Sequence, residues 1–203
     1  MRLFKHFFLA SFVFLSVFAE KIIAAPLTDV NLRAGLISAL KQHPSILGFY
    51  KENEYELIWL KNTEVSRQRR AELINSLKTA SFHGLPAKKY QLKELLGRLS
   101  TSDSSFEIGF LEGLLMISFT HYASDINSGV LVPSEVDSDI VRESKLEDPN
   151  FYIRGLIARD PYDYFRSLGP QSSEYSRLLA EKFKLMELAN NGGWSTLSAG
   201  RIL

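Results

Sequence analysis

Cysteine is absent from all 203 residues of the chain. No disulfide and no thiolate metal site can therefore form, and cysteine cannot act as a nucleophile. An excess of either charge is also missing, since 24 Lys and Arg residues balance 23 Asp and Glu residues. A nearly neutral chain has no electrostatic attraction to nucleic acid or to an anionic membrane surface, so we expect neither as a partner.

Motifs that accompany catalysis or cofactor binding are missing as well. The chain has no GxSxG turn of a serine hydrolase, no phosphate-binding loop, no dinucleotide fingerprint and no calcium loop. His43, His83 and His121 lack the HxH or HxxxH spacing through which two imidazoles reach one metal, so we expect them to be isolated from one another. The sequence therefore predicts no catalytic residue, no cofactor and no metal site.

Two carboxylates, Glu112 and Asp125, flank the most apolar segment of the chain. Thirteen residues of helix, rising about 1.5 Å each, would separate them by roughly 20 Å. The paired carboxylates of a glycosidase lie within about 10 Å of each other, so these two cannot form such a pair. We expect Glu112 instead to be buried or half-buried and to accept hydrogen bonds from the backbone of a neighbouring loop.

Aromatic residues are plentiful, and exposed aromatic rings could stack on sugars in a groove for glycan strands. The helical spacing of most of them favours a place in the core instead. The candidates are Phe49, Tyr50, Tyr55, Trp59, Tyr90, Tyr122, Tyr152, Tyr162, Tyr164, Phe165 and Trp194.

Residues 1–25 have the layout of a secretory signal peptide. Arg2 and Lys5 precede an apolar stretch, Phe7–Phe18, which is followed by the small residues Ala19 and Ala24. The apolar stretch covers about a dozen residues, whereas a membrane-spanning helix needs roughly 20. We expect cleavage after Ala19 or Ala24 and an exported product without a stable membrane span. An uncleaved anchor is the alternative.

Helical periodicity dominates the remaining chain and predicts a mainly α fold, a single orthogonal helical-bundle domain. In the first half, we expect helices over 29–41, 45–50, 65–82 and 92–99. The aromatic content of residues 54–59 suggests an extended segment there. Gly84 suits the left-handed position after the last turn of the third of these helices.

A long central helix is predicted over 106–127, because this segment is apolar almost all round. A helix with so little polar surface belongs at the centre of a bundle. Gly109 and Gly113 lie four residues apart on one side of it and would let another helix approach closely. We interpret this spacing as dense packing within the domain, with a dimer interface as the alternative.

The second half begins with a break at 129–133 and a polar connector over 134–147. Asp148-Pro149 and Asp160-Pro161 then announce two short helices that end near Ala158 and Leu168, since each step pairs a capping residue with a proline in the first turn. A last helix is expected over 172–190 and stops at Gly192-Gly193. We expect its apolar side chains to point inward: Tyr175, Leu178, Leu179, Phe183, Met186 and Ala189.

Four segments in this order resemble the helical scaffold domain of large periplasmic L,D-transpeptidases. The resemblance covers about residues 44–200. Its parts are the run 48–59; the run 77–86 with Tyr90; the run 112–122 with Ala123, Asp125, Gly129 and Pro133; and the run 175–188 leading into Gly192-Gly193-Trp194.

The resemblance implies an L,D-transpeptidase scaffold-like domain over 26–197 and, over 198–203, the start of a connector to domains that are absent. Full-length members of the family continue into a peptidoglycan-binding domain and a catalytic domain with a Ser-His-Gly-Cys motif. Because this chain has no cysteine, we expect no enzyme activity from it alone. The resemblance implies a non-catalytic periplasmic protein of peptidoglycan crosslinking or remodelling, with peptidoglycan or an L,D-transpeptidase as its partner.

Two alternatives stay open at the level of sequence. The chain could be the truncated N-terminal part of a murein L,D-transpeptidase, which the DNA downstream of Leu203 would reveal. It could also be an unrelated exported helical binding protein.

Overall fold

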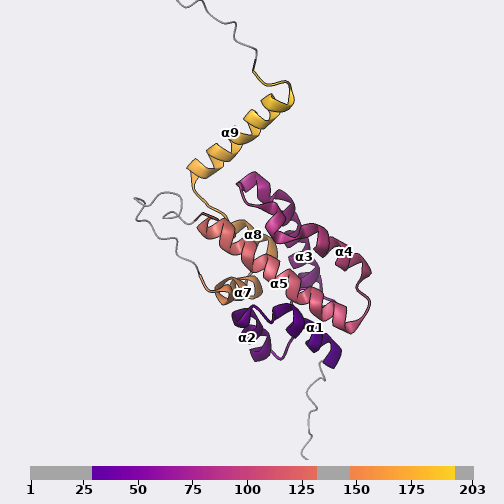
Figure 1. Ribbon diagram of the computed structural model, residues 1–203. Coiled ribbons are helices and arrows are strands. Elements are labelled where there is room, and N and C mark those ends of the chain that lie inside the picture. The colour runs from indigo at the N-terminus through magenta and orange to yellow at the C-terminus, as the bar shows by residue number, and fades with distance from the viewer. Residues whose placement is uncertain (1–28, 132–146, 195–203) are drawn as a thin grey trace, which may run out of the picture.

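The computed structural model describes residues 29–131 and 147–194 (Figure 1). The mainly α prediction is confirmed, because these ranges contain helices and no strand. The predicted signal peptide, the polar connector except Glu147, and residues 198–203 lie outside the described residues. The elements are α1 (Val30–Leu40), α2 (Pro44–Glu52), α3 (Glu64–Thr79), η1 (Ala80–His83), η2 (Ala87–Tyr90), α4 (Leu92–Thr101), α5 (Ser105–Ser128), α7 (Pro149–Ala158), α8 (Pro161–Leu168) and α9 (Ser173–Asn190).

Polar caps define where most of these helices begin. Asp148 accepts a hydrogen bond from the backbone N–H of Asn150, and Asp160 accepts one from Asp163. Proline follows each cap in the first helical turn, where its missing N–H costs nothing. The predicted extents of α7 and α8 are therefore confirmed. Side-chain caps of the same kind start α1, α3, α5 and α9 at Asp29, Thr63, Ser104 and Ser172.

Helix α5 is the buried centre of the domain, as the sequence predicts. Figure 1 shows it crossing the whole body, with the other helices except α9 grouped around it. Its side chains Leu115, Met116 and Phe119 have no exposed surface. Trp59 packs on Phe119 with ring centroids 5.4 Å apart, and Phe165 packs on the same ring at 5.7 Å. No helix of the described residues is long and apolar enough to cross a membrane.

Glycines bring α1 and α5 into backbone contact. A Cβ atom added at Gly109 would lie 1.9 Å from the carbonyl oxygen of Leu32, and one at Gly35 would lie 2.0 Å from the carbonyl oxygen of Phe106. At Gly113 the added atom would meet the Cβ of Ala39 at 2.6 Å. The interpretation of Gly109 and Gly113 as dense packing within the domain is therefore confirmed.

Most of the aromatic candidates lie in or against the core, as their helical spacing predicts, and two are exposed. Tyr162 and Trp194 are 53% and 71% exposed. The other nine candidates are buried or half-buried. A row of exposed rings for stacking on glycan strands is therefore not present among these residues.

The extended segment predicted over 54–59 is wrong. Residues 53–55 form a turn, and Glu54 and Tyr55 have positive φ angles of 51° and 60°. The backbone N–H of Tyr55 bonds to the carbonyl of Tyr50 at 2.7 Å, which ties the turn to the end of α2. The third predicted helix is shorter than expected, because α3 ends at Thr79 and continues as the 3₁₀ helix η1. Gly84 adopts the predicted left-handed conformation, with φ of 78°.

Helix α9 has the predicted extent but not the predicted environment. It begins after the Ser172 cap and stops before Gly192 and Gly193, both of which have positive φ. None of its residues is buried, and Figure 1 shows it projecting from the body. Apart from half-buried Tyr175 and Leu179, the side chains expected to point inward are exposed: Leu178, Phe183, Met186 and Ala189. The apolar side of α9 meets the body only in part, where Tyr175 lies against His83 and Phe183 against Phe82, both of η1.

Candidate functional site

Glu112 lies at the centre of a buried hydrogen-bond network. Its Oε1 accepts hydrogen bonds from the Tyr50 hydroxyl and the Ile58 backbone N–H, both at 2.7 Å. Its Oε2 accepts from the backbone N–H of Leu60 at 2.9 Å, and the N–H of Trp59 lies 3.1 and 3.2 Å from the two oxygens. The side chain has no exposed surface. One carboxylate on α5 therefore holds the loop between α2 and α3, as the sequence predicts.

Burial governs the electrostatics of this network. Desolvation raises the pKa of Glu112, while the hydrogen bonds from Tyr50 and the three backbone N–H groups oppose that rise. Burial and the neighbouring Glu112 raise the pKa of Tyr50 well above its ordinary range. Every partner of Glu112 in the network is a donor from the same domain, so the network fastens the loop after α2 to α5.

Asp125, the second carboxylate considered, also serves the packing of α5. Its two oxygens accept hydrogen bonds from Lys89 Nζ at 2.9 and 2.8 Å, and Oδ2 accepts from the Tyr90 hydroxyl at 2.8 Å. Burial and this contact with Asp125 raise the pKa of Tyr90. Asp125 thereby fixes η2 to α5 and has no contact with Glu112 among the described hydrogen bonds. Both carboxylates lie on α5, thirteen residues apart, so the helical rise separates them by roughly 20 Å.

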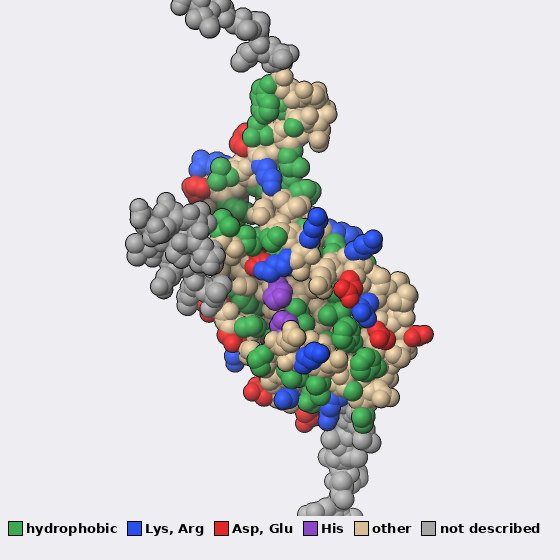
Figure 2. All heavy atoms as spheres, in the orientation of Figure 1, with side chains coloured by type: hydrophobic (Ala, Val, Ile, Leu, Met, Phe, Trp, Pro, Cys, Tyr) green, Lys and Arg blue, Asp and Glu red, His purple; other side chains and the backbone are tan. Residues whose placement is uncertain are grey.

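The histidines are not all isolated, contrary to the expectation from their spacing. The rings of His43 and His121 lie 5.8 Å apart, because α2 begins where α5 passes. Figure 2 shows adjacent histidine side chains on one face of the body. His83 instead contacts Tyr175 of α9, with 2.6 Å between Nδ1 and the hydroxyl oxygen. Among the residues that the structure describes, no three His, Asp or Glu side chains converge to hold a metal ion.

Burial lowers the pKa of two half-buried histidines, His121 and His83. Desolvation is the largest cause for His121, and the positive charge of Lys89 adds to it. Desolvation and Lys182 have the same effect on His83. The neutral form of both imidazoles is therefore favoured. A neutral imidazole carries no positive charge with which to attract an anionic ligand.

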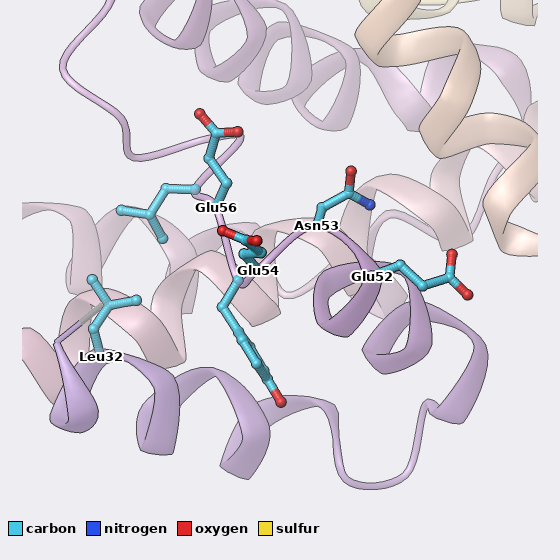
Figure 3. Close-up of a pocket in the computed structure, with 7 residues that line it drawn as sticks. Leu32, Glu52, Asn53, Glu54 and Glu56 are labelled. Atoms are coloured by element: carbon cyan, nitrogen blue, oxygen red, sulfur yellow. The ribbon is translucent and has the colours of Figure 1, made fainter. Parts of the chain in front are cut away.

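A cleft of about 570 Å³ lies at the turn after α2, and we call it the Glu54 cleft. Figure 3 shows that the side chains of Glu52 and Glu56 point away from one another. Glu56 pairs with Lys61. The carboxylates therefore do not converge on a common point, although the cleft is acidic. Its lining residues are Leu32, Glu52, Asn53, Glu54, Tyr55, Glu56 and Leu57.

A second cleft, of about 340 Å³, lies between the same loop, α3 and α7, and we call it the Arg69 cleft. Its walls are mostly apolar, and a guanidinium group lies among them. The Arg69 Nη2 atom makes one long hydrogen bond of 3.5 Å to the carbonyl oxygen of Ile157. Its lining residues are Phe49, Asn53, Glu56, Leu57, Ile58, Lys61, Thr63, Val65, Ser66, Arg69 and Ile157.

A third feature is the exposed apolar side of α9, which we call the α9 surface and define as Leu178, Leu185 and Leu188. These side chains are 70%, 52% and 38% exposed. Spacings of seven and ten residues place them on one side of a helix. A different side of α9 meets η1, where Phe183 packs on Phe82 and Lys182 Nζ donates to the carbonyl of Phe82 at 2.8 Å.

Sequence reasoning missed both the Arg69 cleft and the α9 surface. The residues of the cleft come from α2, its following loop, α3 and α7, so no local motif reveals it. The leucines of α9 were visible in the sequence, but their periodicity predicts burial as readily as exposure. Only the positions of the other helices decide between the two.

A family model described as Scaffold domain matches residues 44–181, which is more than half of the chain. The match runs from the start of α2 into α9 and includes the Glu112 network. No curated protein and no solved structure matches the chain.

Proposed function

Because the chain belongs to the scaffold-domain family of L,D-transpeptidases, we propose that it is a non-catalytic periplasmic scaffold in peptidoglycan crosslinking. In this role, it positions an L,D-transpeptidase rather than performing the reaction. The proposal assigns the chemistry to the partner, since residues 1–203 contain no cysteine to form the thiolate of that reaction.

The observation that carries the proposal is the α9 surface. Apolar side chains that remain exposed along one side of a helix suit a protein-binding site. Leu178, Leu185 and Leu188 present such a surface at the end of a well-packed domain. The family relationship supports a catalytic domain of the transpeptidase class as the protein that covers it.

The signal-like N-terminus supports the proposed periplasmic location. Residues 1–25 have the layout of a secretory signal, and peptidoglycan crosslinking takes place outside the cytoplasm. The near-neutral charge of the chain fits a partner that is recognised by apolar contact rather than by net charge.

Affinity isolation from a periplasmic extract tests this function. We expect the purified chain to retain proteins that carry the Ser-His-Gly-Cys catalytic motif, identified by mass spectrometry. Co-sedimentation with isolated sacculi, measured in parallel, distinguishes direct peptidoglycan binding. If the chain neither retains a transpeptidase nor sediments with sacculi, the proposed function is wrong.

A further inference from the structure

Arg69 is a cation that makes no salt bridge with a carboxylate in the described part of the chain, although the charge of buried Glu112 acts on it. Its Nε atom is buried and has no hydrogen-bond partner there. Its Nη2 makes only the 3.5 Å contact with the Ile157 carbonyl, which is at the outer limit of a hydrogen bond. A half-buried guanidinium usually has its donors satisfied, because unpaired donors are costly to bury.

The neighbouring arginines of α3 show the contrast. Arg67 Nη2 donates to Glu64 at 2.9 Å, and its Nη1 donates to Asn62 at 3.1 Å. Arg70 donates to the backbone carbonyl of Trp59. Both are therefore committed to partners in the domain, whereas Arg69 is available to a ligand.

The cleft around Arg69 limits the charge and shape of that ligand. Glu56 at the rim is paired with Lys61, so Arg69 supplies the net positive charge of the lining. This balance suits one negative charge better than two. The apolar walls, formed by Phe49, Val65 and Ile157 among others, suit a small apolar body. The volume of about 340 Å³ is at the lower end of ligand pockets, which suits a small ligand.

A polar group of the lining favours a peptide over other carboxylates. The Nδ2 atom of Asn53 already donates to the Phe49 carbonyl at 2.8 Å, but its Oδ1 can accept a hydrogen bond from a peptide N–H. Thr63 also lines the cleft, but its hydroxyl is engaged with Ser66 as the cap of α3. Guanidinium and carboxylate groups match in geometry through two parallel hydrogen bonds. Turning Arg69 toward such a group would sacrifice only its long contact with Ile157.

We propose that the Arg69 cleft binds the C-terminal carboxylate of a short peptide whose last residues are small and apolar. The carboxylate pairs with Arg69, and the final side chains lie against the apolar walls. This site is separate from the α9 surface, so either proposal can fail without the other.

An NMR titration of the purified chain tests the site, with N-acetyl-alanyl-alanine as the probe. We expect saturable shifts at the backbone amides of Leu57, Ile58 and Val65. The C-terminal amide of the same peptide should bind at least about tenfold more weakly, since it lacks the charge that pairs with Arg69. Inorganic phosphate is the third ligand, and we expect it to bind more weakly than the peptide acid.

Variants assign the effect to Arg69. Arg69→Gln should weaken binding of the acid about tenfold or more, while Arg67→Gln, which removes an equal charge outside the cleft, should leave it unchanged. Val65→Glu is a second test that does not depend on the folding of Arg69→Gln. It places a negative charge at an exposed position of the cleft wall and should abolish binding of the acid. Equal binding of acid and amide, stronger binding of phosphate, no saturable shifts, or full binding by Val65→Glu would each overturn the proposal.

Discussion

The hydroxyl of Tyr50 on α2 donates a 2.7 Å hydrogen bond to Oε1 of Glu112 on α5, where neither side chain has exposed surface. The same carboxylate accepts hydrogen bonds from the backbone N–H groups of Ile58, Trp59 and Leu60. Tyr50 and the loop that follows α2 are thus bound to the central helix through one side chain. The wall of the Arg69 cleft depends on this attachment, because Ile58 lines it.

Replacing Glu112 should therefore cost much more stability than replacing Tyr50. In Glu112→Gln, an NH₂ group takes the place of an acceptor and meets a backbone donor, so we expect a loss of about 3 kcal/mol in the free energy of unfolding. Tyr50→Phe removes one donor and should cost about 1 kcal/mol. Urea unfolding followed by circular dichroism measures both. A Glu112→Gln variant as stable as the wild-type chain would contradict the structural role of this network.

The second prediction concerns the backbone contact between α1 and α5, which requires glycine at position 109. Gly109→Ala should destabilise the domain by about 2 kcal/mol or more, because the new methyl group would meet the Leu32 carbonyl at 1.9 Å. Gly48→Ala is the matched control, since nothing lies within 4 Å of its added Cβ. This control lies within α2 and should be stabilising by about 0.5–1 kcal/mol. Thermal unfolding of the two variants should shift in opposite directions.

Acidic pH should weaken the domain through His121, which is half-buried. The folded pKa of His121 lies below the unfolded value of 6.5, so the unfolded chain binds the proton more tightly. The stability from this group is fully present above about pH 6.5 and is lost as the pH falls through the folded pKa. The positive charge of Lys89 disfavours the protonated form of His121, as does any charge on the neighbouring His43 ring, while the negative charge of Asp125 opposes them.

The comparison of wild type with His121→Gln isolates this effect, since the contribution of Glu112 is common to both chains. We expect the free energy of unfolding to change less between pH 7 and pH 5 in the variant. Identical pH dependence in the two chains would show that His121 does not titrate differently on unfolding.

Replacing the exposed leucines of α9 with charged residues should have little effect on the stability of the domain. Leu178→Glu and Leu185→Glu should each change the free energy of unfolding by no more than about 0.5 kcal/mol, because neither side chain is buried. Leu115→Ala, in the fully buried part of α5, should cost about 3 kcal/mol. Substantial unfolding of the α9 variants would mean that the leucines pack against the body.

The parts of this fold that the sequence predicts well are those that local chemistry determines. Asp148-Pro149 and Asp160-Pro161 define the starts of α7 and α8, and a long apolar run locates α5 and indicates the structural role of Glu112 within it. In each case, the signal and the structure lie within a few turns of one another.

The missed parts depend on contacts between distant segments. His43 and His121 meet only because α2 begins beside α5, and the Arg69 cleft draws its walls from three helices and a loop. The left-handed conformation of Glu54 and Tyr55 follows from the way α2 ends over the loop, which neither residue type indicates. Leu178 and Leu185 carry a helical apolar pattern, but a pattern does not show whether another helix covers it.

Binding of a purified L,D-transpeptidase with a Ser-His-Gly-Cys catalytic domain, measured by titration calorimetry, tests the central claim most directly. We expect saturable binding that Leu178→Glu combined with Leu185→Glu reduces at least about tenfold. Ser176→Glu, which adds a charge on another side of α9, should bind as the wild-type chain does. No binding by the folded wild-type chain, or equal binding by the double variant, would contradict the account.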